Sequence, residues 1–420
     1  MRRSIALALA LLFEAAAARA FLEVPATYAT IQQAVDAARD GDVVRVAPGV
    51  YTGRVVIAGK AIVLASHYLT SGDPALIERT VIDGGGRRSA IRIADSVGPG
   101  TAIRGFTIRN AHDGVRASGR FEFTHNRVTA TRDGIGYESG SGGLVRDCIF
   151  ENNRDDGIDL DQDSEVVIER SEIRNNGNDG IEVRLHDYTG PELAIVIRGN
   201  RISGNAEDGV QLIGDQAPSS RVFRIERNLF ANNAQAAIGM MCCMKSREDF
   251  QAASLPERIY LFDNTFVGND HGVTGGDNTI ALNNLFAHTT RIAIKGMNGR
   301  SIAAHNLFFA NGSDWVDSSV DPATAIRADP LLDADLRLSP RSPAIDAGTA
   351  FFEWNSEVVL NRGPGEYAGL APDLGAFEAP ARSGAASPPR CALGAELALV
   401  LAPLLFLARQ RSLLRGAGAG

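Results

Sequence analysis

The strongest constraint on the fold is a nine-residue pattern that recurs at a fixed spacing. Residues 152–160 read NNRDDGIDL, and residues 175–183, 23 positions later, read NNGNDGIEV. A repeat of this length is typical of stacked architectures, in which each unit contacts only its two neighbours. Apolar and polar residues alternate within the unit, as in Ile158-Asp159-Leu160. This alternation indicates short strands with one buried face.

Two columns of apolar residues extend the pattern along most of the chain, and a turn that often contains Asp-Gly separates them. Gly and Asp both suit a tight corner, because Gly adopts positive φ freely and Asp bonds to its own backbone. The first column is Phe106, Val128, Ile149, Ile173, Ile202, Phe230, Phe266, Phe286 and Phe308; the second is Val115, Ile135, Ile158, Ile181, Val210, Ile238, Val273, Ile294 and Val316.

Short strands that recur once per turn of a repeat cannot bury their apolar face alone. Stacked about 4.8 Å apart, they form parallel sheets around an apolar interior. We therefore predict an all-β fold, a right-handed parallel β-helix of about 10 to 12 coils over residues 21–318, followed by a C-terminal cap segment over 319–380. Residues 30–39 place Ile31, Ala34, Val35 and Ala38 on one stripe of a short helix, which would cover the open end of the stack. Asn residues at the corners are expected to bond along the stack: Asn126, Asn200, Asn228, Asn264, Asn284 and Asn306.

Composition excludes several classes of function. The net charge of −8 opposes binding to phosphate backbones, so we expect no nucleic-acid partner. Four Cys in 420 residues are too few for a disulfide scaffold, and the adjacent pair Cys242-Cys243 lacks the spacing of an ordinary zinc site.

Both ends of the chain indicate export. Arg2 and Arg3 precede an apolar run and the small residues Ala18-Arg19-Ala20, which together predict a signal peptide over residues 1–20. Residues 381–390 have the composition of a linker. Residues 391–420 begin with Cys391, continue as an apolar stretch to Ala408 and end in an Arg-containing tail. This segment predicts an anchor in the envelope membrane with a cytoplasmic C-terminus.

Three segments resemble known bacterial families. The run TYATIQQAVDAARDGDVVRVAPGVYTGRVVI resembles the opening of pectin-lyase-like right-handed β-helix proteins built from PbH1 repeats. The stretch ADPLLDADLRLSPRSPAIDAG, followed by PDLGAFE, resembles the end of bacterial surface β-helix proteins that carry variable anchors. The tail resembles myxosortase-type sorting signals, in which a Cys opens the motif. These resemblances imply a β-helix at the cell surface and a sorting protease that acts near Cys391, with a plain membrane anchor as the alternative.

Three consecutive coils carry extra residues at one phase of the repeat. The insertions are HDYTGPEL (186–193), GDQAPSS (214–220) and MCCMKSREDFQAASLPE (241–257). Loops at the same phase of neighbouring coils lie side by side, so we expect one wall beside a functional surface. The alternative is that these loops are tolerated surface insertions.

Next to this wall, alternation directs two polar columns outward. Asp159, Glu182 and Gln211 form one column, and Asp161 and Arg184 belong to the next. Carboxylates as close as Asp159 and Glu182 either raise one pKa or recruit a cation, so this pair is a candidate Ca²⁺ site. The alternative is a solvated face in which Arg184 pairs with Asp161.

Resemblance to β-helix polysaccharide lyases and epimerases implies further candidates. Some of those enzymes use Ca²⁺ to neutralise a uronate and Arg or Lys to take the proton, and others use His and Tyr. By this analogy the candidate catalytic residues are Arg184, His186, Tyr188 and Lys245. We expect an exported, monomeric module that binds a polysaccharide or is structural. The alternative is a lyase, epimerase or hydrolase that acts on an acidic polysaccharide.

Truncation after Pro380 is expected to release the protein into the culture medium, because it removes the predicted linker and anchor. Fractionation followed by immunoblotting of the two forms checks this. A truncated form that stays with the membranes like the full chain would place the anchor elsewhere.

Overall fold

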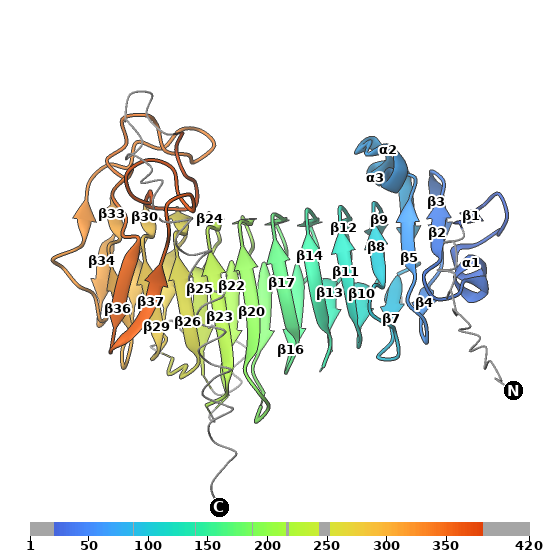
Figure 1. Cartoon of the computed structure of the whole chain (residues 1–420), viewed down its shortest axis with the longest axis horizontal. Helices are drawn as coiled ribbons and strands as arrows, with labels where there is room; N and C mark the ends of the chain where they lie inside the picture. Colours follow the sequence, from blue (N-terminus) through green and yellow to red (C-terminus); the bar gives the residue numbers. More distant parts are fainter. Residues whose placement is uncertain are drawn as a thin grey trace, which may run out of the picture.

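The computed structural model describes residues 21–380, except 87, 139, 187, 216–217 and 243–252. Three long parallel sheets wind around a common axis, so that each coil contributes one strand to each sheet (Figure 1). Sheets A and B have 12 strands and sheet C has 11, which confirms the predicted right-handed parallel β-helix and its number of coils. The predicted signal peptide, linker and anchor lie outside the described residues. No helix in the described ranges is long and apolar enough to cross a membrane.

The strands follow one another along each sheet in chain order. Sheet A contains β1 (Phe21–Val24), β2 (Val43–Val46), β5 (Val63–Ser66), β8 (Ala102–Arg104), β11 (Arg120–Thr124), β14 (Gly142–Arg146), β17 (Glu165–Glu169), β20 (Leu193–Arg198), β23 (Arg221–Glu226), β26 (Arg258–Phe262), β29 (Thr279–Leu282) and β32 (Ile302–Ala304). Sheet B contains β3 (Gly49–Thr52), β6 (Thr80–Asp83), β9 (Thr107–Arg109), β12 (Arg127–Thr129), β15 (Ile149–Glu151), β18 (Glu172–Arg174), β21 (Arg201–Ser203), β24 (Leu229–Ala231), β27 (Thr265–Val267), β30 (Leu285–Ala287), β33 (Leu307–Phe309) and β35 (Ile326–Arg327). Sheet C contains β4 (Val55–Ile57), β7 (Ile91–Ile93), β10 (Asp113–Ala117), β13 (Asp133–Tyr137), β16 (Ile158–Asp161), β19 (Ile181–Arg184), β22 (Val210–Ile213), β25 (Ala236–Met241), β28 (His271–Thr274), β31 (Ile292–Lys295) and β34 (Ser313–Val316).

The N-terminal end of the stack is covered by helix α1 (Ile31–Ala37), as predicted. Thr30 caps the helix by accepting a hydrogen bond from the backbone N–H of Gln33, and the Gln33 side chain accepts one from the N–H of Thr30. Ile31, Ala34 and Val35 are buried against the first coil. Two shorter helices, α2 (Tyr68–Ser71) and α3 (Ala75–Arg79), lie in one corner near the same end (Figure 1).

The C-terminal segment covers the outer faces of the last coils. The antiparallel pair β36 (Phe351–Trp354) and β37 (Glu357–Asn361) places Leu360 in a cluster with Tyr260, Phe262 and Leu282 of sheet A. Ala344 and Leu374 pack on the outer face of sheet B. These contacts remove from water an apolar outer surface that an exposed sheet would leave open.

The interior is a set of ladders of like residues. Phe230, Phe266, Phe286 and Phe308 stack with ring centroids 4.6 to 5.3 Å apart and planes within 11° of parallel, which confirms the predicted column. The corner Asn residues bond along the stack as predicted: the side-chain oxygen of Asn264 accepts hydrogen bonds from the backbone N–H and the side-chain amide of Asn228. A second Asn ladder, which we did not predict, links Asn153, Asn176, Asn205, Asn233 and Asn269.

Three assignments in the predicted columns were wrong. Val128 pairs with Phe150 rather than Ile149, and its other neighbour in the column is Ile108 rather than Phe106. At the C-terminal end, Ile294 pairs with Trp315 rather than Val316. Two of the errors are shifts by one residue, and in a strand such a shift moves the side chain to the opposite face.

Replacing Ile181 with Asp is expected to destabilise the fold severely, because Ile181 is fully buried and the carboxylate would have no partner in the interior. The matched control is Val196→Asp, at a partly exposed position of β20. Thermal unfolding should show a large loss for the first variant and a small one for the second. Similar melting temperatures for the two variants would contradict the assigned interior.

Candidate functional site

The two predicted polar columns lie on the outer face of sheet C. Asp159 pairs in register with Glu182, and Glu182 with Gln211, while Asp161 pairs with Arg184. The register is therefore as predicted. The expected exposure of Glu182 was wrong: this side chain is buried, at 3% exposure, as is Gln211. Glu182 forms an ion pair with Arg184 on the same strand, and Asp155 and Asp133 of the two preceding coils contribute to raising its pKa.

A polar cavity of about 170 Å³ lies beside Asp159, on the side of the coils that precede it in the chain. Gly136 occupies the position between Arg116 and Asp159 in the register, and a Cβ there would meet only open space. Because Gly136 has no side chain, a hollow remains between its two neighbours. Its lining includes Arg116, Arg132, Asp133, Asp159, Asp161 and Arg184.

Ion pairs order most of these charges. Arg116 contacts Glu138 at 2.6 Å, Arg132 contacts Asp155 at 2.7 Å, and Arg184 contacts Glu182 at 2.6 Å. Arg184 thus pairs with Glu182, and not with Asp161 as the alternative from the sequence had it. Asp159 differs, because its Oδ1 is buried and meets no hydrogen-bond donor among the described residues.

Burial raises the pKa of three carboxyl groups around the cavity. The pKa of Asp159 rises to about 8, because it is buried and because Glu182 and Asp161 lie close by. Burial raises the pKa of Glu182 to about 7, although Arg184 opposes the shift. The pKa of Asp133 rises to about 6, chiefly through burial, with Arg132 acting in the opposite direction. Asp159 is therefore largely protonated at neutral pH and can donate a proton or a hydrogen bond into the cavity.

The described residues of the insertions lie at the corner between sheets C and A, where Arg221 contacts the first of them. Arg221 as a residue is 2% exposed, and its guanidinium donates to the backbone carbonyls of Gln162 and His186 and stacks on Tyr188 at 4.8 Å. Ser219 donates to Glu257 of the third insertion. The structure thus places Tyr188 under Arg221 and outside the lining of the cavity.

Some predicted residues cannot be placed, and others were missed. Lys245 and Cys391 lie outside the described residues. The predicted Ca²⁺ ligands Asp159 and Glu182 remain a prediction. Arg116, Arg132 and Asp133 were not predicted as site residues, although the repeated Asp-Gly turns in the sequence already indicated the column to which Asp133 belongs.

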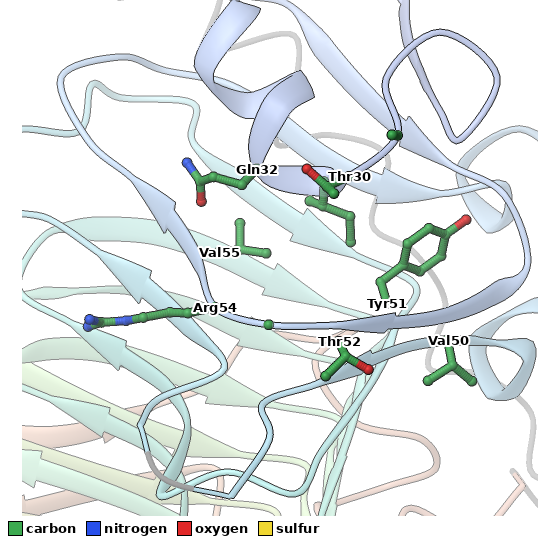
Figure 2. A pocket seen from close by; sticks show the side chains of 10 residues that line it. Thr30, Gln32, Val50, Tyr51, Thr52, Arg54 and Val55 are labelled. Atoms are coloured by element: carbon green, nitrogen blue, oxygen red, sulfur yellow. The ribbon is translucent and has the colours of Figure 1, made fainter.

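Another hollow, of about 330 Å³, lies at the N-terminal end between α1 and the β3–β4 corner (Figure 2). Thr30, Gln32 and Tyr51 line it. Gln32 bonds to both the N–H and the carbonyl of Val56, and the Tyr51 hydroxyl donates to Ala47. The polar side chains here are thus engaged in holding the cap together.

Comparison with protein families decides the affiliation of the chain. A family model described as NosD, periplasmic copper-binding protein, matches residues 70–299, more than half of the chain. The chain belongs to the NosD family. No curated protein sequence matches it.

Solved structures similar to this NosD-family chain include three carbohydrate-active β-helix proteins. Pectate lyase Pel9A is 18% identical over 82% of this chain and 90% of its own, with a TM-score of 0.48. The A-module of the Azotobacter vinelandii mannuronan C-5 epimerase AlgE6 is 16% identical over 71% and 94%, with a TM-score of 0.48. The catalytic unit of a GH87 α-1,3-glucanase from Streptomyces thermodiastaticus is 14% identical over 71% and 64%, with a TM-score of 0.47.

The raised pKa of Asp159 predicts that stability falls as the pH rises. The pKa of Asp159 is about 8 in the folded state and about 3.9 in the unfolded state. Its favourable contribution to the free energy of unfolding is therefore complete below about pH 4 and is lost as the pH rises to about 8. Melting temperatures between these limits should fall less steeply in Asp159→Asn than in the parent. Asp335→Asn, an exposed control, should keep the parental slope. Equal slopes in the parent and Asp159→Asn would contradict the assignment.

Proposed function

We propose that this NosD-family chain is an exported envelope module that binds a glycan in the cavity on sheet C. The observation that carries the proposal is the cavity itself, a polar hollow with three guanidinium groups and a buried carboxyl whose Oδ1 has no donor among the described residues. Neighbouring hydroxyls of a sugar match planar, bidentate groups such as guanidinium and carboxyl. A ligand hydroxyl that donates to Asp159 would supply the missing hydrogen bond.

Export is part of the proposal. The family description places its members in the periplasm, and the N-terminal residues have the pattern of a signal peptide. Anchoring through the tail that begins at Cys391, with or without a sorting protease, rests on the sequence pattern. A rigid solenoid is suited to project a binding face from a membrane, because its sheets run unbroken along the axis.

Copper binding, which the family description names, does not fit the ligands that the described residues bring together. Cu ions favour thiolate, thioether and imidazole ligands. Within the described ranges, the group of three or more ligand-type side chains that converge contains carboxylates alone. Cys148 is a buried free thiol, and Cys242 is disulfide-bonded. We therefore assign no copper chemistry to this face.

A polysaccharide lyase, epimerase or hydrolase is the second candidate, and the pKa of Asp159 favours it. A carboxyl group with a pKa of about 8 can serve as a general acid near neutral pH. Arg184 lines the same cavity and would neutralise a uronate carboxylate of the substrate. An enzyme of the lyase type would form unsaturated products that absorb in the ultraviolet, and loss of this absorbance in Arg184→Ala would support it.

Filling the cavity is expected to abolish glycan binding without unfolding the protein. Gly136→Val adds a β-branched side chain into open space on a strand, so the fold should tolerate it. Binding to a panel of neutral and acidic glycans, measured by array and then by calorimetry, should be lost in this variant and weakened in Arg184→Ala. Arg291→Ala, which removes an exposed guanidinium outside the cavity, is the control. A folded Gly136→Val variant that binds like the parent, or a parent that binds no glycan, would overturn the proposal.

A further inference from the structure

Three arginines lie close together at the N-terminal end of sheet C. Arg54 comes directly before β4, and Arg92 lies on β7, the strand that pairs with β4. Arg88 lies at the corner that leads into β7, and both Arg88 and Arg92 are near enough to act electrostatically on Arg54. Arg92 pairs in register with Arg116 of β10, which lines the cavity at Gly136. Arg54, Arg88 and Arg92 thus form an arginine patch that continues the cavity toward the N-terminus.

The charges of the arginine patch are not neutralised by the protein. In the part of the chain that the structure describes, none of the three arginines contacts a carboxylate, and Arg54 donates instead to the hydroxyl of Ser89 at 3.4 Å. The other arginines around the cavity each contact a carboxylate at 2.6 or 2.7 Å. The carboxylates of Asp113 and Glu138, on the two strands that follow β7, are both engaged by Arg116. The patch therefore carries positive charge that is free to act on a ligand.

Arg54 shows what this arrangement costs the fold. Burial, and then the charges of Arg92 and Arg88, hold the pKa of Arg54 below its ordinary value. Its Nε is buried and meets no acceptor among the described residues. Figure 2 shows the side chain extending away from Tyr51, and it reaches Ser89 of the next coil. Like charges held together without a counter-ion are unfavourable, so an anionic group bound between these guanidinium groups would relieve the repulsion.

The chemistry of the patch selects oxyanions. The planar N–H pairs of guanidinium match the oxygens of carboxylate, sulfate and phosphate groups. Coils of a parallel sheet repeat at about 4.8 Å, so the row from Arg116 through Arg92 to Arg54 extends over roughly 10 Å. A row of this length suits anionic groups that recur along a chain better than a single free anion. The chain as a whole is acidic, but charges farther away than about 8 Å are largely screened at physiological ionic strength, so the local sign decides.

We propose that the arginine patch binds the carboxylate or sulfate groups of an acidic glycan, one sugar of which occupies the cavity at Gly136. The inference rests on the proposed function for the sugar in the cavity, and it adds the class of the ligand. A neutral glycan would use the cavity alone. An acidic glycan would also neutralise the patch and would run along the outer face of sheet C toward the N-terminal cap.

The test compares three oligosaccharides of equal length, one neutral, one built from uronates and one sulfated, by calorimetry on the purified chain. At least one acidic ligand should bind at least about tenfold more tightly than the neutral one, because hydrogen bonds to charged groups are stronger than those between neutral groups. Raising the NaCl concentration should reduce this preference, since salt screens exposed charges. Equal affinities for the neutral and both acidic ligands would overturn the inference.

Substitutions in the patch connect the preference to its arginines. Arg92→Gln should weaken binding of the acidic ligand at least about fivefold and change that of the neutral ligand by less than about twofold. Arg92 makes no ion pair or side-chain hydrogen bond within the described ranges, so the melting temperature of the unliganded variant should not fall. Arg88→Gln, at an exposed corner position, tests the same point if Arg92→Gln does not fold. Arg341→Gln, which removes another exposed guanidinium without a carboxylate partner among the described residues, is the matched control and should bind like the parent.

The outcomes separate this inference from the proposed function. If Gly136→Val abolishes binding of all three ligands but Arg92→Gln and Arg88→Gln keep the parental affinities, the cavity binds glycan and the arginine patch does not. If binding of the acidic ligand is lost in Arg92→Gln but kept in Gly136→Val, the patch binds anionic groups and the proposed function of the cavity is wrong. Inorganic phosphate that binds as tightly as the acidic oligosaccharides, at matched ionic strength, would overturn the inference, because the site would then recognise a free anion.

Discussion

The structure depends on in-register pairing between identical phases of successive coils. Each strand is only a few residues long, and it is held by the strand before it and the strand after it. Register then determines what stacks on what, from the Phe230–Phe308 column in the interior to the Asn ladders at the corners. Because neighbouring coils are about 4.8 Å apart, any residue type that recurs at one phase becomes a line of close contacts.

The same in-register stacking places carboxyl groups next to one another at the corner that leads into sheet C. Like residues in register are favourable when they are Phe or Asn, since rings stack and amides both donate and accept. Aspartates in register repel one another, and burial adds to the cost. The pKa values of Asp156 and Asp179 are raised, in both cases first by burial and then by neighbouring carboxylates. This column of aspartates lies beside the cavity at Gly136, and Asp133 belongs to both.

Among the described residues of the insertions, the clearest contribution is a set of contacts around Arg221. Arg221 stacks on Tyr188 and bonds to the backbone of two corners. A buried guanidinium that donates to two carbonyls and stacks on an aromatic ring favours one arrangement of the segments it joins. The cavity itself is formed one step away, by side chains of the sheet that the wall adjoins.

The sequence by itself determined the architecture, because the period of the repeat, the alternation within it and the Asn-Asp-Gly corners each permit few alternatives. It also determined the register that joins Asp159 to Glu182 and Gln211. Tertiary structure decided the rest. Whether Ile149 or Phe150 faces the interior depends on a shift of one residue, which strands of three residues cannot specify alone. The burial of Glu182, the hollow at Gly136 and the meeting of Arg116 and Arg132 with Asp133 arise between coils about 20 residues apart, where the width of each corner sets which side chains touch.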